Sequence, residues 1–377
     1  MIDVTNCNEH KKALISHLNE LKKLPVEEFT FREKYNELTE DDTTPLELNR
    51  AFNKVWRPRN IFNERLTISE MEKLNTIMVP VKDKELLSLW RILRTYCSTM
   101  PNRNVRGRNL KFMVMDTITE KVLGVAIIAS DFGSIKTRDD YIGWSKTNKF
   151  QDKRLHCSAN AACVVPTQPF GYNFLGGKLI ASLLTTKIVR DAWFNQYGDI
   201  LAGITVTALY GKRSMYQRIP GWRECGETAG TTSVSPDEEY YKAWYQWLSI
   251  HRDYASEQIK RGASERDRLI KLMFKECGLR QSDYANNFHR GCYYAGLYSN
   301  FKEFFQNKIG ERDLVLKPTL ARDVTGVLDG WKQRAINRYR NLLRDNRINP
   351  EVQSYLKINK SMDYDRAKAL YLGRVGR

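Results

Sequence analysis

Four apolar runs in the middle of the chain constrain its fold more than any other feature. They cover residues 111–115, 122–130, 161–165 and 200–209, and each has the length of a strand. Six residues, 116–121, separate the first two runs, which indicates a hairpin. Between the third and fourth runs, apolar residues recur at helical spacing over 174–188. The order strand, strand, strand, helix, strand predicts a mixed α/β or α+β core.

Helical spacing frames this core on both sides. Before residue 100 it predicts four helices, over residues 11–24, 46–56, 68–77 and 86–96. After residue 235 it predicts a helix that starts at Pro236 with Ser235 as N-cap, and three more over residues 266–276, 293–308 and 324–344. We therefore expect a helical region over 1–100, an α/β core over 101–235 and a helical, basic region over 236–377.

Positive charge is the second constraint. The 377 residues include 61 Lys and Arg against 44 Asp and Glu, a formal net charge of +17, and such a field favours phosphate polymers such as DNA. The best phosphate contacts lie in a loop after Pro101 and in the final predicted helix, at Arg103, Arg106, Arg108, Lys332, Arg334 and Arg338. Two alternatives stay open: the excess charge only keeps the chain in solution, and the final helix only presents a solvated face.

Cysteine usage and hydropathy limit the compartment. Seven cysteines are scattered without a CxxC motif, which suits a reducing compartment and argues against a disulfide framework or a zinc ribbon. No run reaches the roughly 18 apolar residues of a membrane helix, and the N-terminus has no signal-peptide core. The five histidines show no metal-ligand spacing. We expect a cytoplasmic protein without a membrane or metal partner.

The junction over residues 163–184 is the most informative local pattern. A buried strand that stops at Pro166, turns through Gln168 to Asn173 and starts a long helix can present free backbone N–H groups to an anion. Gly171 lets the backbone approach a phosphate closely. The alternative is an ordinary strand-to-helix turn without a ligand.

This junction resembles the Gcn5-related N-acetyltransferase superfamily. Gln168, Gly171 and Asn173 occupy the places of the superfamily's pyrophosphate signature, although a small residue is expected where Asn173 stands. The hairpin before the junction and the strand after it match the superfamily's element order. The resemblance implies an acetyltransferase-like mixed sheet and a site for acetyl-CoA or a related acyl-CoA, formed by Val165, Gln168, Phe170, Gly171, Tyr172 and Asn173.

A wider resemblance covers roughly residues 100–235. The segment 138–145 (Arg-Asp-Asp-Tyr-Ile-Gly-Trp-Ser), the junction, and Leu209-Tyr210-Gly211 with Ser214 and Tyr216 resemble an uncharacterised family of bacteriophage genomes that includes the A protein of the Druantia anti-phage system. The resemblance implies a phage or phage-defence setting in a bacterial cell, work on DNA, and phage or defence-system protein partners. Mom-type DNA modification enzymes are a mechanistic analogue at the level of the fold alone.

Several side chains are candidates for chemistry. Tyr210 or Tyr216 can protonate a departing thiolate, and Ser214 lies beside them. Asp139 or Asp140 can act as a base or hold a metal, unless Arg138 pairs with one of them at the surface. Arg138 can instead contact nucleic acid. Each tyrosine can also be a packing residue.

Two tryptophans and the candidates above lead to three hypotheses. Trp144 and Trp222 can stack on an extruded base or belong to the core. The first hypothesis is a group (acyl) transferase that modifies DNA bases. The second is a non-enzymatic nucleic-acid-binding component of a phage or defence complex, and the third is a metal-dependent DNA-nicking protein.

Overall fold

The computed structural model describes residues 7–101, 105, 107–208, 214–228, 231–234, 236–253, 265–317, 324–351, 358 and 362–375. The chain divides into two compact units. One unit comprises Met1–Phe29 and Ala229–His289, and the other comprises Thr30–Thr228 and Arg290–Arg377. The predicted boundaries near residues 100 and 235 follow changes of secondary structure along the chain, whereas these units are assembled from segments distant in sequence.

The smaller unit is a helical body with its own core. It contains α1 (Cys7–Lys23), α11 (Glu238–His251) and α13 (Glu265–Cys277), with the short strands β7 (Thr231–Ser233) and β8 (Ala285–Asn287) paired antiparallel. Leucines of α1 pack with Trp244 and Trp247 of α11 and with Met273 of α13. The amphipathic spacing that predicted these helices is thus satisfied by burial within this unit.

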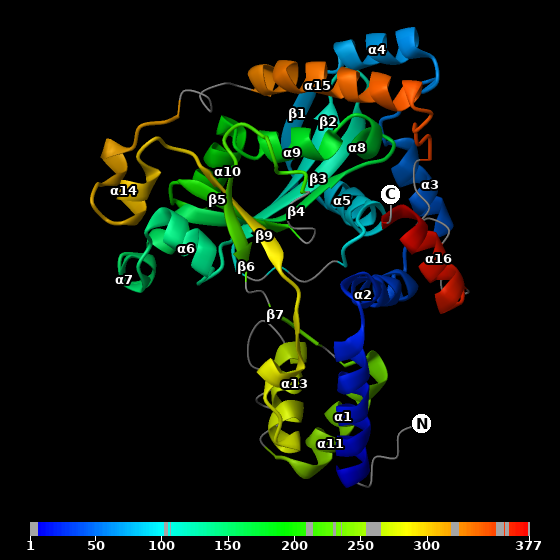
Figure 1. Cartoon of the computed structure of the whole chain (residues 1–377), viewed down its shortest axis with the longest axis vertical. Coiled ribbons are helices and arrows are strands. Elements are labelled where there is room, and N and C mark those ends of the chain that lie inside the picture. The colour runs from blue at the N-terminus through cyan, green and yellow to red at the C-terminus, as the bar shows by residue number, and fades with distance from the viewer. Residues whose placement is uncertain are drawn as a thin grey trace. The chain divides into compact units, whose positions relative to one another are not determined.

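The larger unit is built on a seven-stranded mixed sheet with the strand order β1-β2-β3-β4-β5-β9-β6 (Figure 1). The strands are β1 (Thr76–Pro80), β2 (Asn109–Asp116), β3 (Lys121–Ser130), β4 (Ser158–Pro166), β5 (Gly203–Ala208), β6 (Arg223–Thr228) and β9 (Arg290–Gly296). Every neighbouring pair in this order is antiparallel except β4 and β5, which are parallel.

Helices cover both faces of this sheet. One face carries α4 (Glu64–Lys73), α8 (Phe170–Asn173), α9 (Gly176–Leu183), α10 (Lys187–Tyr197) and α15 (Val324–Arg344). The other face carries α2 (Val26–Glu40), α3 (Pro45–Asn53), α5 (Lys84–Cys97) and α16 (Tyr364–Val375). Phe112 and Val114 of β2 face the first layer and Met113 faces the second, as the period of a strand requires. Both faces are therefore buried in apolar side chains.

A third group of helices packs near the strands β5 and β9. It consists of α6 (Lys136–Ile142), α7 (Lys146–Phe150) and α14 (Phe301–Phe305). Trp144, Phe301 and Phe305 share an apolar cluster with Tyr294 of β9. This cluster forms the surroundings of the polar network described below.

The structure confirms several predicted elements. The hairpin appears as β2 and β3, the helix over 324–344 appears as α15, and Thr44 caps α3 with Pro45 at its start. The predicted helix over 174–188 is present only in part: Leu175 adopts a left-handed conformation (φ 55°) before α9 begins, α9 ends at Leu183, and α10 begins at Lys187.

Two predicted helices are wrong in part or in whole. The predicted helix over 293–308 is mostly wrong: β9 occupies Arg290–Gly296, and only Phe301–Phe305 are helical in that stretch. Apolar and aromatic residues at 292–297 are buried from both sides in a central strand, and such runs cannot be told from helices by spacing. The helix expected over 68–77 ends at Lys73, and Thr76–Pro80 form the edge strand β1. None of the helices in the described ranges combines the length and the apolar character that a membrane crossing needs.

Candidate functional site

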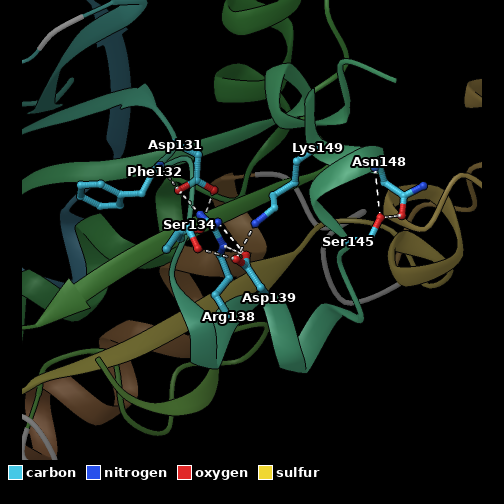
Figure 2. A network of polar contacts seen from close by, with 9 residues as sticks. Asp131, Phe132, Ser134, Arg138, Asp139, Ser145, Asn148 and Lys149 are labelled. Atoms are coloured by element: carbon cyan, nitrogen blue, oxygen red, sulfur yellow. Dashed lines mark hydrogen bonds and ion pairs between the residues drawn. The ribbon is translucent and has the colours of Figure 1, made fainter. Parts of the chain in front are cut away.

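A buried polar network lies where β3 ends and α6 begins (Figure 2). Asp131 directly follows β3, and its side chain is fully buried. Its Oδ2 accepts hydrogen bonds from Ser158 Oγ and, at 2.7 Å, from Thr205 Oγ1, and its Oδ1 accepts one from the Phe132 N–H at 2.8 Å. Ser158 begins β4 and Thr205 lies in β5, so Asp131 ties together the two parallel strands.

Arg138 is the fully buried cation of this network. Its Nη1 lies 2.8 Å from Asp131 Oδ1 as an ion pair, although the two atoms are not aligned as a hydrogen bond. Its Nε and Nη2 donate to Asp139 Oδ1 at 3.0 and 2.7 Å. Its guanidinium carbon stands 5.2 Å from the ring centroid of Trp144. The Arg138 side chain, which was predicted to contact nucleic acid, is therefore buried and used in ion pairs inside the protein.

Asp139 is neutralised from two sides. Besides Arg138, it accepts a hydrogen bond at 2.6 Å from Lys149 Nζ of α7, a side chain that is 5% exposed. Ser145 caps α7 by accepting from the Asn148 N–H at 3.1 Å, which positions Lys149 one residue later. Two cations and two carboxylates thus balance in charge, and a carboxylate held in this way is poorly suited to act as a free base.

Burial sets the pKa values of this network. Complete burial raises the pKa of Asp131, while Arg138 and the Ser158, Thr205 and Phe132 donors oppose that rise. Burial acts to lower the pKa of Arg138, but Asp131 and Asp139 outweigh it and raise that pKa. The pair is ionised, because the guanidinium keeps its proton and the carboxylate accepts from three further donors.

The two adjacent aspartates are not brought together. Asp140 has a side chain that is 65% exposed and pairs with Lys136 at 3.0 Å on the surface of α6. Within the described part of the chain, no group of three or more His, Cys, Asp or Glu side chains has the arrangement of a metal site. The donor set at 139–140 therefore does not fit the metal site of the DNA-nicking hypothesis.

The predicted cofactor turn is present, but its backbone N–H groups donate hydrogen bonds to acceptors in or next to the turn itself. The N–H groups of Gly171, Tyr172 and Asn173 donate to Thr167 O, Gln168 Oε1 and Pro169 O at 2.7, 3.1 and 3.2 Å. A β-carbon on Gly171 would come within 2.7 Å of the Gln168 side chain and the Pro166 ring. The glycine is thus required for the packing of the turn onto itself.

The other predicted cofactor residues lie in the core. The side chain of Val165 belongs to the apolar cluster on the α5 face of the sheet, whereas Phe170 belongs to the cluster on the α15 face. Asn173 is fully buried, donates from Nδ2 to Asn349 O at 2.7 Å and accepts at Oδ1 from the Asn349 N–H at 3.0 Å. The asparagine that departs from the acetyltransferase pattern therefore holds the segment after α15.

One cationic side chain lies against this turn, and others lie near α9, the helix that follows it. Arg338 of α15 lies over the ring of Tyr172, 5.3 Å from its centroid, and its Nε is buried without a hydrogen-bond partner among the described residues. The pKa of Lys178 is lowered, first by burial and then by the charges of Arg334 and Arg218. The structure thus brings the predicted turn and the predicted basic helix to one place, which sequence spacing did not indicate.

The remaining candidates are dispersed. Tyr216 is fully buried against Trp222 and Tyr293, and burial raises the pKa of its hydroxyl. Ser214 accepts from the Tyr216 N–H. Trp144 and Trp222 are buried core residues. Tyr210, Arg103 and Arg106 lie outside the described residues.

The two other predicted phosphate contacts have partners of their own. Arg108 is ion-paired with Asp199 and stands over the Tyr197 ring. Lys332 donates to Glu72 O at 2.7 Å.

A shallow pocket of about 310 Å³ lies on one face of α10. Its walls are formed by Lys187, Arg190, Asp191, Phe194, Ile200, Leu201, Tyr298 and Leu316. None of these residues was selected from the sequence. The pocket is therefore separate from the predicted cofactor turn.

Comparison with known proteins identifies the family. The family model "Druantia protein DruA" matches residues 30–307. A curated Druantia protein DruA from Escherichia coli (strain UMEA 4076-1) is 26% identical over 227 residues, which are 55% of each chain. The chain thus matches about half the length of that relative, and no solved structure matches. Because the family model covers well over half of its residues, this chain belongs to the Druantia protein DruA family.

Proposed function

We propose that this chain works in anti-phage defence as a DNA-acting acyltransferase with an acetyltransferase-like sheet. The observation that carries the proposal is the position of Arg338 over Tyr172 of the Gln168–Asn173 turn, together with Arg334 and Arg218, whose charges act on Lys178 of α9. Phosphate groups are the natural partners of such a cluster, and both DNA and coenzyme A carry them. The defence setting rests on family membership.

The sheet topology supports the fold part of this proposal. β4 and β5 pair in parallel only over Ser158–Asn160 and Gly203–Thr205. Beyond these residues β4 and β5 do not pair with each other, although β4 stays paired with β3 up to Pro166 and β5 stays paired with β9 up to Ala208. Strands that stop pairing leave backbone donors and acceptors for another partner. The amide-containing arm of coenzyme A is chemically suited to that role.

The fit of coenzyme A depends on side chains rather than on the turn. The amides of the turn are used internally, so the phosphates of a bound acyl-CoA would be held by Arg218, Arg334 and Arg338. A bound acyl-CoA would supply the activated acyl group. In the transfer, a base amine forms a bond to the acyl carbon, the carbon–sulfur bond breaks, the amine loses a proton and the departing sulfur gains one. Tyr216 stays protonated at neutral pH and can donate, provided that the sulfur comes within hydrogen-bond reach.

A second candidate function is DNA binding without group transfer. The internal hydrogen bonds of Gly171, Tyr172 and Asn173 favour it, because they leave these amides no role toward a cofactor. In this reading the same arginines contact the phosphate backbone alone. The two candidates differ in whether coenzyme A stabilises the protein.

Variants on α15 test both candidates. Changing Gly171 is unsuitable, since any side chain there collides with Pro166 and Gln168. Arg334→Gln with Arg338→Gln removes charge while keeping the helix, and Arg344→Gln, a 73% exposed side chain on the same helix, is the matched control. We expect the double variant to weaken DNA binding and to reduce the salt dependence of log K by about 2, while the control loses about 1 or less.

Thermal shift with acetyl-CoA separates the two candidates. Acyl transfer requires that acetyl-CoA raise the melting temperature of the unmodified chain and that the double variant lose this shift. DNA binding without any shift supports the second candidate. Unchanged DNA binding by the double variant contradicts the role given to these arginines.

A further inference from the structure

Two cysteines face each other across the strands β6 and β9. The antiparallel register pairs Glu224 with Tyr293 and Gly226 with Cys292, so Cys225 is the extra residue of a β-bulge. In such a bulge two consecutive residues oppose one residue of the partner strand, and Cys225 and Gly226 together oppose Cys292. Apart from Cys225–Cys292, no pair of cysteines in the described chain is opposed across a strand pairing.

The two thiols lie close together beside α6. Each thiol shifts the pKa of the other, while the Cys225 thiol donates to the Arg223 carbonyl at 3.7 Å. The buried hydroxyl of Thr137 in α6 also lies near Cys292, although it is not aligned as a hydrogen bond with any described residue. A β-carbon on Gly226 would lie 3.4 Å from the methyl group of Thr137, which places this part of β6 against the same helix. Arg138, the cation of the buried network, directly follows Thr137.

The surroundings of the two thiols shift their pKa values in opposite directions. The neighbouring Cys225 thiol lowers the pKa of Cys292 against the effect of burial, and the Thr137 hydroxyl and the Arg138 charge act in the same direction. The interaction with Cys292, and then burial, raises the pKa of Cys225. A thiol that ionises more readily, next to a protonated thiol, is the arrangement that favours disulfide formation.

Access differs between the two residues as well. Cys225 is partly exposed, whereas Cys292 is fully buried. Three other cysteines, Cys97, Cys157 and Cys163, are buried, and burial raises the pKa of each. Cys225 and Cys292 thus differ from these three buried cysteines in two ways: their thiols are neighbours, and Cys225 is accessible to an oxidant in solution.

We propose that Cys225 and Cys292 form a reversible disulfide and are an oxidative modification site of this protein. With hydrogen peroxide as oxidant, the two thiols lose two protons and two electrons, a sulfur–sulfur bond forms, and the peroxide becomes two molecules of water. A dithiol reductant reverses the reaction. The new bond replaces the two neighbouring thiols by a disulfide and changes the side chain next to Thr137. The proposal does not depend on the acyltransferase activity.

Mass spectrometry of the full chain tests this site. The purified protein is treated with hydrogen peroxide, remaining thiols are alkylated, and the chain is digested without reductant. We expect a linked peptide that contains Cys225 and Cys292 and that disappears after dithiothreitol. Under denaturing conditions the oxidised chain should titrate two fewer thiols than the seven of the reduced chain.

Serine variants provide the controls. Cys225→Ser changes a partly exposed position and should abolish the linked peptide without unfolding the chain, whereas Cys157→Ser should retain it. Cys292→Ser should abolish it as well. The proposal is overturned if, after peroxide treatment of the folded protein, both Cys225 and Cys292 are alkylated once the chain is denatured, or if Cys225 is linked to other cysteines as often as to Cys292.

Discussion

Nη1 of Arg138 lies 2.8 Å from Oδ1 of Asp131, and neither side chain has any exposed surface. This ion pair connects α6 to the end of β3, and through Ser158 and Thr205 it also holds β4 against β5. The parallel pairing of β4 and β5 is short, so these side-chain contacts are a substantial part of what fixes the centre of the sheet.

We predict that removing one partner of the Asp131–Arg138 pair strongly lowers the free energy of unfolding. Replacing both partners by apolar residues should lower it much less. Asp131→Ala should lower the free energy of unfolding by about 3–5 kcal/mol, because it leaves two buried cations, Arg138 and Lys149, with the single carboxylate of Asp139. Asp131→Leu combined with Arg138→Met should cost less than the sum of the two single changes. Urea unfolding measures both. Asp140→Ala, at an exposed position on the same helix, should stay within about 0.5 kcal/mol, and equal costs at 131 and 140 would contradict the account.

The sequence predicted the general layout of the core better than its site. The hairpin, β4, β5 and α15 could be predicted from the spacing of apolar residues along the sequence, because each of these elements buries apolar residues that recur with its own period. The helix expected over 293–308 failed because β9 is buried on both faces. Asp131 was missed because a single carboxylate after an apolar run has no local signal, and its partners Ser158 and Thr205 lie 27 and 74 residues away.

A second prediction concerns Lys34 of α2. Its side chain is completely buried, donates to Glu37 Oε2 at 2.8 Å and to the Thr95 carbonyl, and burial lowers its pKa from 10.5 to about 8. At pH values between about 8 and 10.5, Lys34 carries a proton in the unfolded chain that it has lost in the folded chain. Stability from this group therefore rises with pH through that window, by about 1 kcal/mol per pH unit.

Comparison with Lys34→Met isolates this effect. Relative to the variant, the unmodified chain should become more stable in urea as the pH rises from 8 to 9. Measurements stay below pH 9 because burial raises the pKa of Cys97 to about 12, and titration of that thiol in the unfolded chain then acts in the opposite direction. Lys82→Met, at an exposed position, should show no such difference. A parallel pH response of the unmodified chain and Lys34→Met would contradict the prediction.

A third prediction concerns Asn173, which the acetyltransferase pattern would replace with a small residue. Asn173→Ala leaves the carbonyl and N–H of Asn349 without their partner, and we expect a loss of about 1–3 kcal/mol in the free energy of unfolding. Amide exchange of Asn349 should speed up at the same time. Asn337→Ala, on an exposed position of α15, is the control and should change neither quantity appreciably. Unchanged exchange at Asn349 would show that the contact does not hold that segment.

Nucleoside mass spectrometry tests the proposed transfer of a group from acyl-CoA to DNA. Plasmid DNA is recovered from bacterial cells that express the chain or the Arg334→Gln, Arg338→Gln variant, and is digested to nucleosides. We predict one deoxynucleoside with added acyl mass, present with the unmodified chain and reduced with the variant. If only the ordinary deoxynucleosides appear while the purified chain binds DNA in a salt-dependent manner, group transfer is contradicted and binding alone remains.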